Sequence, residues 1–267
     1  ARRAGAKKAD AGCSDPEDVE REHARFSVEW WAEPIPWYSE KHWGAYRKNE
    51  LRAGYTRREL AADGIIHAKG ILLSVVGVLT MLYRVVSTQP QGSRVGWALL
   101  VYGLSLIAMF VCSAVFNGLA YDKAIMRQLQ VADHAGILLL IAGTYTPVMT
   151  VAGCPRTLAF VWTLTSVSFV VKATRSRFDT RYLHVPVFLG AGWSVMSVWP
   201  SVTAVLSTWA TTLFQVGGSL YTIGLVPWVS NSFEGHNAMW HVFVLAASCC
   251  FFAVCYVEIA AGSWEHI

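Results

Sequence analysis

Charged side chains are scarce in this sequence. Lys, Arg, Asp and Glu make up 15% of its 267 residues, whereas hydrophobic residues make up 54%. Soluble domains usually carry about a quarter charged residues. This composition argues against an ordinary soluble protein and favours one that is largely embedded in a membrane.

The few charges are concentrated at one end of the chain. Residues 1–63 hold 12 of the 22 Lys and Arg and 12 of the 18 Asp and Glu. The net charge is only +4, and the basic residues do not alternate with aromatics along one face, so we expect no nucleic-acid partner. We divide the chain into an extramembrane N-terminal segment, residues 1–63, aromatic-rich and partly extended, and a transmembrane domain, residues 64–262.

The cysteines include no CxxC pair. Four of the six lie inside apolar runs, where a thiol behaves as a small hydrophobic side chain. They are Cys13, Cys112, Cys154, Cys249, Cys250 and Cys255. We interpret them as packing residues rather than as metal ligands or disulfide partners.

Seven stretches come close to the length of a membrane-spanning helix, which needs roughly 20 apolar residues because every backbone N–H must be satisfied within the segment. The predicted spans are residues 64–86, 95–117, 133–152, 157–171, 183–199, 202–228 and 238–260. The fourth is short and the boundary at Pro200 is soft, so six or eight helices are also compatible with the pattern. The predicted fold is an all-α, polytopic membrane protein with seven transmembrane helices.

Basic residues favour one side of the predicted bundle. The N-terminal side carries the first segment, Lys123, Arg127 and four basic residues between 172 and 181, whereas the other side carries Arg94 and Arg156, with Arg84 at a helix end. This bias predicts an N-terminus on the cytosolic or matrix-like side. The opening ARRAGAKKADAG is basic and rich in small residues, which fits either the remnant of a removed targeting peptide or a sequence that starts late.

Aromatic residues crowd the second half of the N-terminal segment. Residues 26–46 contain four Trp and two Tyr around two Pro, with no clean helical period. Aromatics at this density prefer partly wet surfaces. The segment is either an arm at the membrane interface or a docking surface for another protein, whose candidate residues are Trp30, Trp31, Trp37 and Trp43.

Several ordered motifs extend over most of residues 55–260. They are YTRRELAADGIIHAKG (55–70), SAVFN (113–117), DHAGILLLIAGTYTP (133–147), GAGW (190–193), GGSLYTIG (217–224) and NAMWHVFVLAAS (237–248). In this order they resemble the haemolysin III and progestin-and-adipoQ receptor (PAQR) family of seven-helix membrane proteins. The resemblance implies a haemolysin III/PAQR-like bundle.

The resemblance also implies a metal site. Members of the family hold zinc with one His that ends the second helix, in SxxxH, and two in HxxxH on the seventh, while an Asp at the start of the third holds a zinc-bound water. Such a zinc lowers the pKa of water toward ~7 and polarises a carbonyl. Known activities in the family suggest hydrolysis of lipid amides, and some members are receptors. In this sequence Ser113, Asp133 and His241 match, but Asn117 and Asn237 replace the other two His.

An amide oxygen is a poor replacement for an imidazole nitrogen on zinc. We therefore expect no zinc cofactor, although a bound lipid is compatible with the bundle. The degenerate site is predicted to be a hydrogen-bonded network of Ser113, Asn117, Asp133, Asn237 and His241.

If a metal were bound, its ligands would be His241, His236 and Asp133. Residues five apart on a helix lie about 140° from each other, so His236 could join His241 only if the helix began after His236. His67 and His134 lie near predicted helix starts, where a hydrogen-bonded imidazole is ordinary.

The retained scaffold and degenerate site predict a non-catalytic family member that serves as a structural or accessory subunit of a larger membrane complex. Its expected partners are membrane lipids and other membrane-protein subunits. The alternative is a zinc-dependent hydrolase of lipid amides or a lipid-responsive receptor. The mitochondrial inner membrane is the favoured location, with another organellar membrane or the plasma membrane as alternatives.

Overall fold

The computed structural model describes residues 56–89, 93–119, 123–174, 178–230, 233–262 and 264. Within these ranges the chain forms helices and no strand. The tryptophans predicted for docking, Trp30, Trp31, Trp37 and Trp43, lie outside the described residues.

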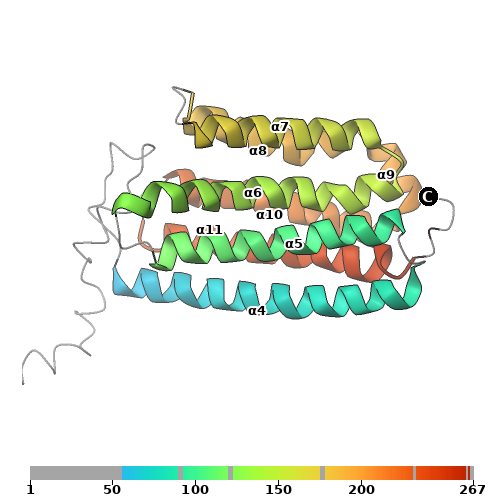
Figure 1. The fold of residues 1–267 in the computed structure, drawn as a ribbon, viewed down its shortest axis with the longest axis horizontal. Coiled ribbons are helices and arrows are strands. Elements are labelled where there is room, and N and C mark those ends of the chain that lie inside the picture. Colours follow the sequence, from blue (N-terminus) through green and yellow to red (C-terminus); the bar gives the residue numbers. More distant parts are fainter. Residues whose placement is uncertain are drawn as a thin grey trace, which may run out of the picture.

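The helices run alongside one another along the long axis of the molecule (Figure 1). They are α4 (Arg57–Thr88), α5 (Arg94–Ala114) with a π-helix (Val115–Leu119), α6 (Lys123–Val151), α7 (Pro155–Ala173), α8 (Arg181–Trp193) with a 3-10 helix (Ser194–Val198), α9 (Trp199–Val205), α10 (Thr208–Ser230), and α11 (His236–Ala253) with a π-helix (Val254–Ile259). The predicted all-α fold is confirmed.

Five helical segments in the described part of the chain are long and apolar enough to cross a membrane. They are Arg57–Thr88, Arg94–Gly118, Arg127–Val151, Tyr182–Val205 and His236–Ile259. α7 and α10 are not among them, because α7 carries Arg156 and Lys172 near its ends and α10 carries Gln215 with several Thr and Gly. A polytopic membrane fold is therefore shown, and the count of seven spans stays a prediction.

The outer surface of α4 is apolar. Leu72, Leu79, Tyr83 and Val86 are between 63% and 82% exposed. A continuous apolar surface of this kind is rare on a soluble monomer but suits contact with lipid. The exposed side of α4 is thus consistent with a helix at the periphery of a membrane-embedded bundle.

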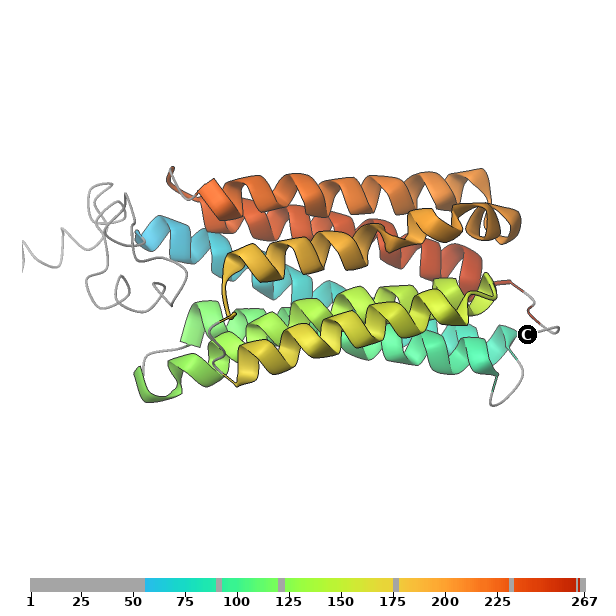
Figure 2. The same ribbon diagram turned by 90° about the horizontal axis from the view of Figure 1, so that it is seen from above.

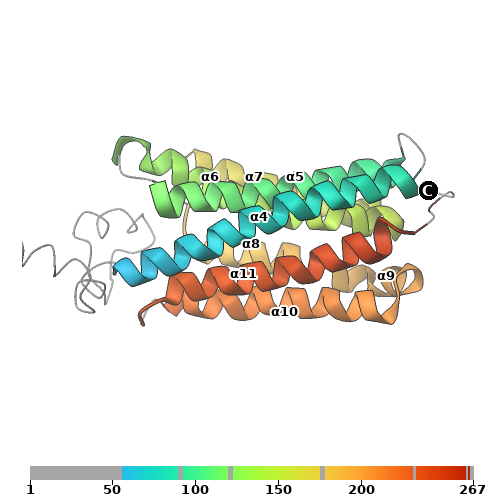
Figure 3. The same cartoon turned by 90° about the horizontal axis from the view of Figure 1, so that it is seen from below.

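Helices that are consecutive in sequence pack against each other, and α11 returns to pack against α4. α4 lies between α5 and α11 (Figure 3). Figure 2 shows the same bundle from the opposite side, with α10 and α11 along one edge and α5, α6 and α7 along the other. This closed order brings the first and last helices together, although almost the whole domain separates them in sequence.

Three predicted boundaries differ from the structure. α4 begins at Arg57 rather than at residue 64, because Thr56 and Glu59 form a capping box in which each side chain accepts the other's backbone N–H, at 3.3 and 2.7 Å. α6 begins at Lys123, ten residues before the predicted start. The chain does not turn at Pro200, where the sequence indicated a soft helix boundary. Pro200 lies in the first turn of α9, where a proline is tolerated, and the chain turns at Leu206, whose backbone is extended.

The start of α4 is fastened to the start of α11. Glu59 Oε1 accepts a hydrogen bond from the Gly235 N–H at 2.6 Å, and the Thr56 hydroxyl donates to Glu234 Oε1 at 2.8 Å. Gly235 has a φ of 80°, in the left-handed region that favours glycine. These bonds align the two helices, so side chains in their first turns can meet.

The close contact between α5 and α6 gives a test of the packing. A Cβ added at Gly136 would lie 2.9 Å from the Met109 Cα, a backbone atom that cannot move aside by itself. We expect Gly136→Ala to destabilise the bundle by about 1–3 kcal/mol, the usual range for overpacking. The measurement is the thermal unfolding midpoint of the purified protein in detergent.

The control for this test is Gly190→Ala, because Gly190 is exposed and a Cβ there would meet no atom within 4 Å. Its midpoint should stay level or rise, since alanine favours helix. Equal midpoints for the two variants would contradict the packing described.

Candidate functional site

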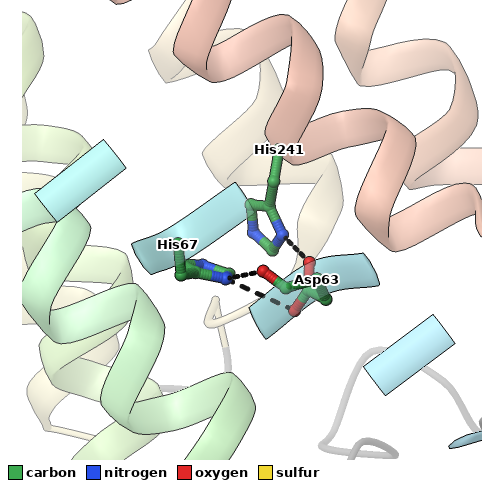
Figure 4. Close-up of side chains that lie close together, drawn as sticks. All are labelled: Asp63, His67 and His241. Atoms are coloured by element: carbon green, nitrogen blue, oxygen red, sulfur yellow. Dashed lines mark hydrogen bonds and ion pairs between the residues drawn. The ribbon is translucent and has the colours of Figure 1, made fainter. Parts of the chain in front are cut away.

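A buried polar cluster lies at the end of the bundle where α4 and α11 begin. Asp63 and His67 come from α4, Ser113 from the last turn of α5, and His241 from α11; each is 7% exposed or less. Figure 4 shows the imidazoles of His67 and His241 close to each other, both directed toward Asp63. Three separate helices thus contribute polar groups to one enclosed site.

Asp63 fixes the orientation of both imidazoles. His241 Nδ1 lies 2.5 Å from Asp63 Oδ1, and His67 Nδ1 lies 2.8 Å from the Asp63 backbone oxygen and 3.5 Å from Oδ2. A carbonyl oxygen and an ionised carboxylate only accept hydrogen bonds, so both rings are assigned a proton on Nδ1.

Both Nε2 atoms point to Ser113. The Ser113 hydroxyl oxygen lies 3.1 Å from His67 Nε2 and 3.4 Å from His241 Nε2. The two rings meet edge to face with their centroids 4.3 Å apart. Two imidazole nitrogens therefore converge on a single hydroxyl group.

The two asparagines are bonded to each other. Asn237 Nδ2 donates to Asn117 Oδ1 at 3.2 Å, and Asn117 Nδ2 donates to the Ser113 backbone oxygen at 3.0 Å and lies 3.3 Å from Ser113 Oγ. Asn237 Nδ2 also lies 3.5 Å from Asp63 Oδ2. The amides thus extend the network from α11 to the π-helix that follows α5.

The structure brings together Ser113, Asn117, Asn237 and His241, as the sequence predicted for these four. Asp133 on α6 is half-buried and interacts with Ser113 and His241.

Sequence reasoning missed Asp63 as a member and gave His67 only an ordinary role. The signal was present, because an acidic residue and a His four apart on an apolar helix share one face, and ionisable residues in such helices are usually functional.

The described residues contain one group of side chains able to hold a metal. It consists of Asp63, His67 and His241, each with a ligand atom within 4.8 Å of the others. His236 is outside this group: α11 begins at His236 itself, so this residue does not fold back from a loop, and its ring lies against Phe233. Asp133 is likewise outside it.

The zinc arrangement implied by the resemblance does not fit the residues present. It needs imidazoles at positions 117, 237 and 241, and the first two supply amides that are hydrogen-bonded to each other. Neutral amide oxygens are weak ligands for zinc. Positions 117, 237 and 241 therefore do not supply the donor set of that zinc arrangement.

An apolar cavity lies beside the polar cluster, between α5, α6, α8, α10 and α11. It contains about 770 Å³ of empty space, part of which opens to the outside. Met109, one turn before Ser113, and Trp240, next to His241, line its near end. Its lining of aliphatic and aromatic side chains suits a hydrocarbon chain.

A second polar cluster joins α6, α7 and α8. The Asp179 carboxylate lies 2.9 Å from Arg127 Nη2, 3.3 Å from Lys172 Nζ and 3.1 Å from His184 Nε2. His184 Nδ1 in turn lies 3.1 Å from His134 Nε2, so His134 is a hydrogen-bonded imidazole, as the sequence indicated. Because its anion and cations are paired with one another, this cluster serves to hold the three helices together.

Comparisons with known proteins match nearly the whole bundle. A family model described as "Haemolysin-III related" matches residues 57–252, which include every member of the first cluster.

Among curated proteins, the "Hemolysin-3 homolog" of Bacillus subtilis (strain 168) is 29% identical over 208 residues, which are 74% of this chain and 93% of that protein. "Hemolysin-3" of Bacillus cereus is 27% identical over 213 residues, 77% of this chain and 94% of that protein. The Homo sapiens "Monocyte to macrophage differentiation factor" is 26% identical over 220 residues, 78% of this chain and 84% of that protein.

The second cluster generates a stability test. Asp179→Asn would leave the Lys172 ammonium, 1% exposed, without its carboxylate, and should destabilise the bundle by about 3–5 kcal/mol. Adding Lys172→Met to that variant should recover much of the loss, because it removes the uncompensated charge. Thermal unfolding in detergent measures both effects.

Glu258→Gln is the control for this test, since the Glu258 carboxylate bonds Ser207 at an exposed position. It should change the midpoint little. A wild-type midpoint for Asp179→Asn would refute the role assigned to the ion pairs.

Proposed function

Because this chain belongs to the haemolysin-III-related family, we propose that it is a non-catalytic member that serves as an accessory subunit of a larger membrane complex. The family match and the helices that are long and apolar enough to cross a membrane identify it as an integral membrane protein.

The hydrogen bond between Asn117 and Asn237 carries this proposal. These two positions take the places of two imidazoles that the family's metal chemistry requires. Amide side chains join helices through hydrogen bonds without any metal. A pair of this kind preserves the contact between α11 and the end of α5 while removing two of the three ligands that a family-type hydrolase needs.

The aromatic N-terminal segment supplies the proposed docking surface. Trp30, Trp31, Trp37 and Trp43 fall within 14 residues, and tryptophan is enriched among the residues that contribute most to protein interfaces. These residues lie outside the described part of the chain, so their role rests on the sequence alone.

The location is the mitochondrial inner membrane in this proposal, with the N-terminus on the matrix side. The bias of Lys and Arg toward one side of the bundle supports this orientation. Protease protection of an epitope at the N-terminus, in mitoplasts from the native source, tests both points. Plasma-membrane fractionation of the native protein would overturn the location.

Native electrophoresis after extraction in a mild detergent tests the accessory role. The chain should migrate in an assembly much larger than its own 29.5 kDa, and replacing all four tryptophans by Ala should release it from that assembly. Tyr83→Ala with Tyr182→Ala is the matched control, since both rings are 79% exposed on described helices. Migration of the wild-type chain as a lone protomer would contradict the proposal.

The apolar cavity beside His241 favours a second candidate, a zinc-dependent hydrolase of lipid amides or a receptor for such lipids. The discriminating assay incubates the purified protein with a ceramide and measures released fatty acid by mass spectrometry. A non-catalytic protein gives no release above the His241→Ala variant. Release by the wild type that disappears in His241→Ala would establish the second candidate instead.

A further inference from the structure

A line of polar side chains runs along the outer face of α10. Gln215 is exposed, as are Thr208 and Thr212 before it, and Ser219 after it is half-buried. Positions 208, 212, 215 and 219 are spaced by four, three and four residues, so they share one face of the helix. The neighbouring Val216 is also exposed but lies about 100° round the helix from Gln215. Thr208, Thr212, Gln215 and Ser219 form the polar stripe of α10.

The middle of the polar stripe lies deep in the apolar part of the bundle. Phe214 and Gly217, just before and after Gln215, both pack against Phe251 of α11. The rings of Phe214 and Phe251 have centroids 4.9 Å apart, and a Cβ at Gly217 would lie 2.9 Å from the Phe251 ring. Phe251 in turn lies eight residues, or about 12 Å, before the end of His236–Ile259, a stretch long and apolar enough to cross a membrane. A glutamine is too short to reach the membrane surface from this depth, unlike a Lys or Arg that snorkels.

The Gln215 amide makes no hydrogen bond within the part of the chain that the structure describes. Thr212 differs, because its hydroxyl donates to the Thr208 backbone oxygen at 2.7 Å and is thus satisfied within its own helix. An amide carries two donors and an acceptor, and hydrocarbon offers a partner to neither kind of group. The polar stripe therefore favours contact with another helix that brings a hydrogen-bonding group to Gln215.

The chemistry of the stripe matches a second copy of this chain. Each amide of a glutamine pair can donate to the other and accept from it. Two copies with the same orientation in a membrane are related by a twofold axis along the membrane normal, which brings Gln215 of each copy to the same depth. A different subunit would need a polar group placed at that depth, whereas a second copy supplies one by symmetry.

The rest of α10 presents no obstacle to such a contact. Thr208–Ser230 contains no Lys, Arg, Asp or Glu, so like charges do not oppose each other across the axis. Thr212 and Ser219, one turn before and one turn after Gln215, are small enough for two helices to approach closely. α10 also lies along one edge of the bundle (Figure 3), so the contact needs no rearrangement of the other helices.

We propose that two copies of this chain associate in the membrane through the polar stripe of α10, with the two Gln215 amides hydrogen-bonded to each other across a twofold axis. The contact uses no residue of the two buried polar clusters. It joins the chain to itself rather than to other subunits, so the inference goes beyond the accessory role proposed above.

Sedimentation equilibrium of the full chain in density-matched detergent measures this association. The wild type should sediment as a dimer of 29.5 kDa chains. Gln215→Leu should raise the dissociation constant of the dimer by at least about tenfold, because both amides of the pair are lost. Gln215→Asn keeps an amide on a shorter side chain and should weaken the dimer less than Gln215→Leu does.

Val216→Ala is the matched control, since Val216 is the next residue and 41% exposed but lies off the stripe. This variant should keep the wild-type dissociation constant. Equal weakening by Gln215→Leu and Val216→Ala would contradict the assigned face. A wild-type chain that stays monomeric at every concentration reached would overturn the proposal and leave a different subunit as the partner of Gln215.

Oxidative cross-linking of the purified protein locates the contact without removing the amide pair. Ser219→Cys should give a disulfide-linked dimer above the background of the wild type, whose own cysteines include the exposed Cys249. Val216→Cys should stay at that background, and the opposite pattern would overturn the proposal. The dimer is measured on the chain alone, whereas the accessory role is measured on the native assembly, so either can fail without the other.

Discussion

The contact of Asp63 with two imidazoles is the constraint on which the rest of the site depends. A carboxylate in a membrane-embedded helix is costly and persists only with partners. The Asp63 carboxylate accepts from His241 Nδ1–H and, at 3.5 Å, from the amide of Asn237, while the Asp63 backbone oxygen accepts from His67 Nδ1–H. By accepting these bonds Asp63 sets the tautomer of each ring and directs both Nε2 atoms toward Ser113.

That arrangement requires the first and last helices to be held in register. The capping box at Thr56 extends α4 by two turns beyond its purely apolar stretch, and Glu59 in the same box binds the backbone at the start of α11. Asp63 lies one turn after Glu59, opposite His241. The capping box at the start of α4 therefore also fixes the position of α11 against α4, and so the contact between Asp63 and His241.

The two polar clusters differ in how their carboxylates are balanced. Asp179 is bonded to an arginine and a lysine, so its negative charge is neutralised within the protein. The Asp63 carboxylate accepts from the His241 imidazole and the Asn237 amide and lies 3.5 Å from His67 Nδ1. The second cluster is therefore a structural tie whose carboxylate is neutralised by basic side chains, whereas the first holds its carboxylate with imidazole and amide donors.

The sequence predicted the all-α fold, the approximate helices and four of the clustered residues, because apolar runs and motif order are local properties. It did not predict that Asp63 belongs to the site. The imidazole that Asp63 binds, His241, is 178 residues away and reaches it only once α11 has packed against α4. The turn at Leu206 was missed for a related reason: Pro200 looked like a breaker, but its position in the first turn of α9 is one that helices accept. The count of membrane spans and the role of the tryptophans are still predictions.

Nitrogen-15 NMR of the histidine side chains, assigned by substitution in the purified protein, is the most direct measurement of the central claim. His67 and His241 should both carry hydrogen on Nδ1, which donates to Asp63. An Nε2–H tautomer at either residue would contradict it, because Asp63 could then not be holding that ring.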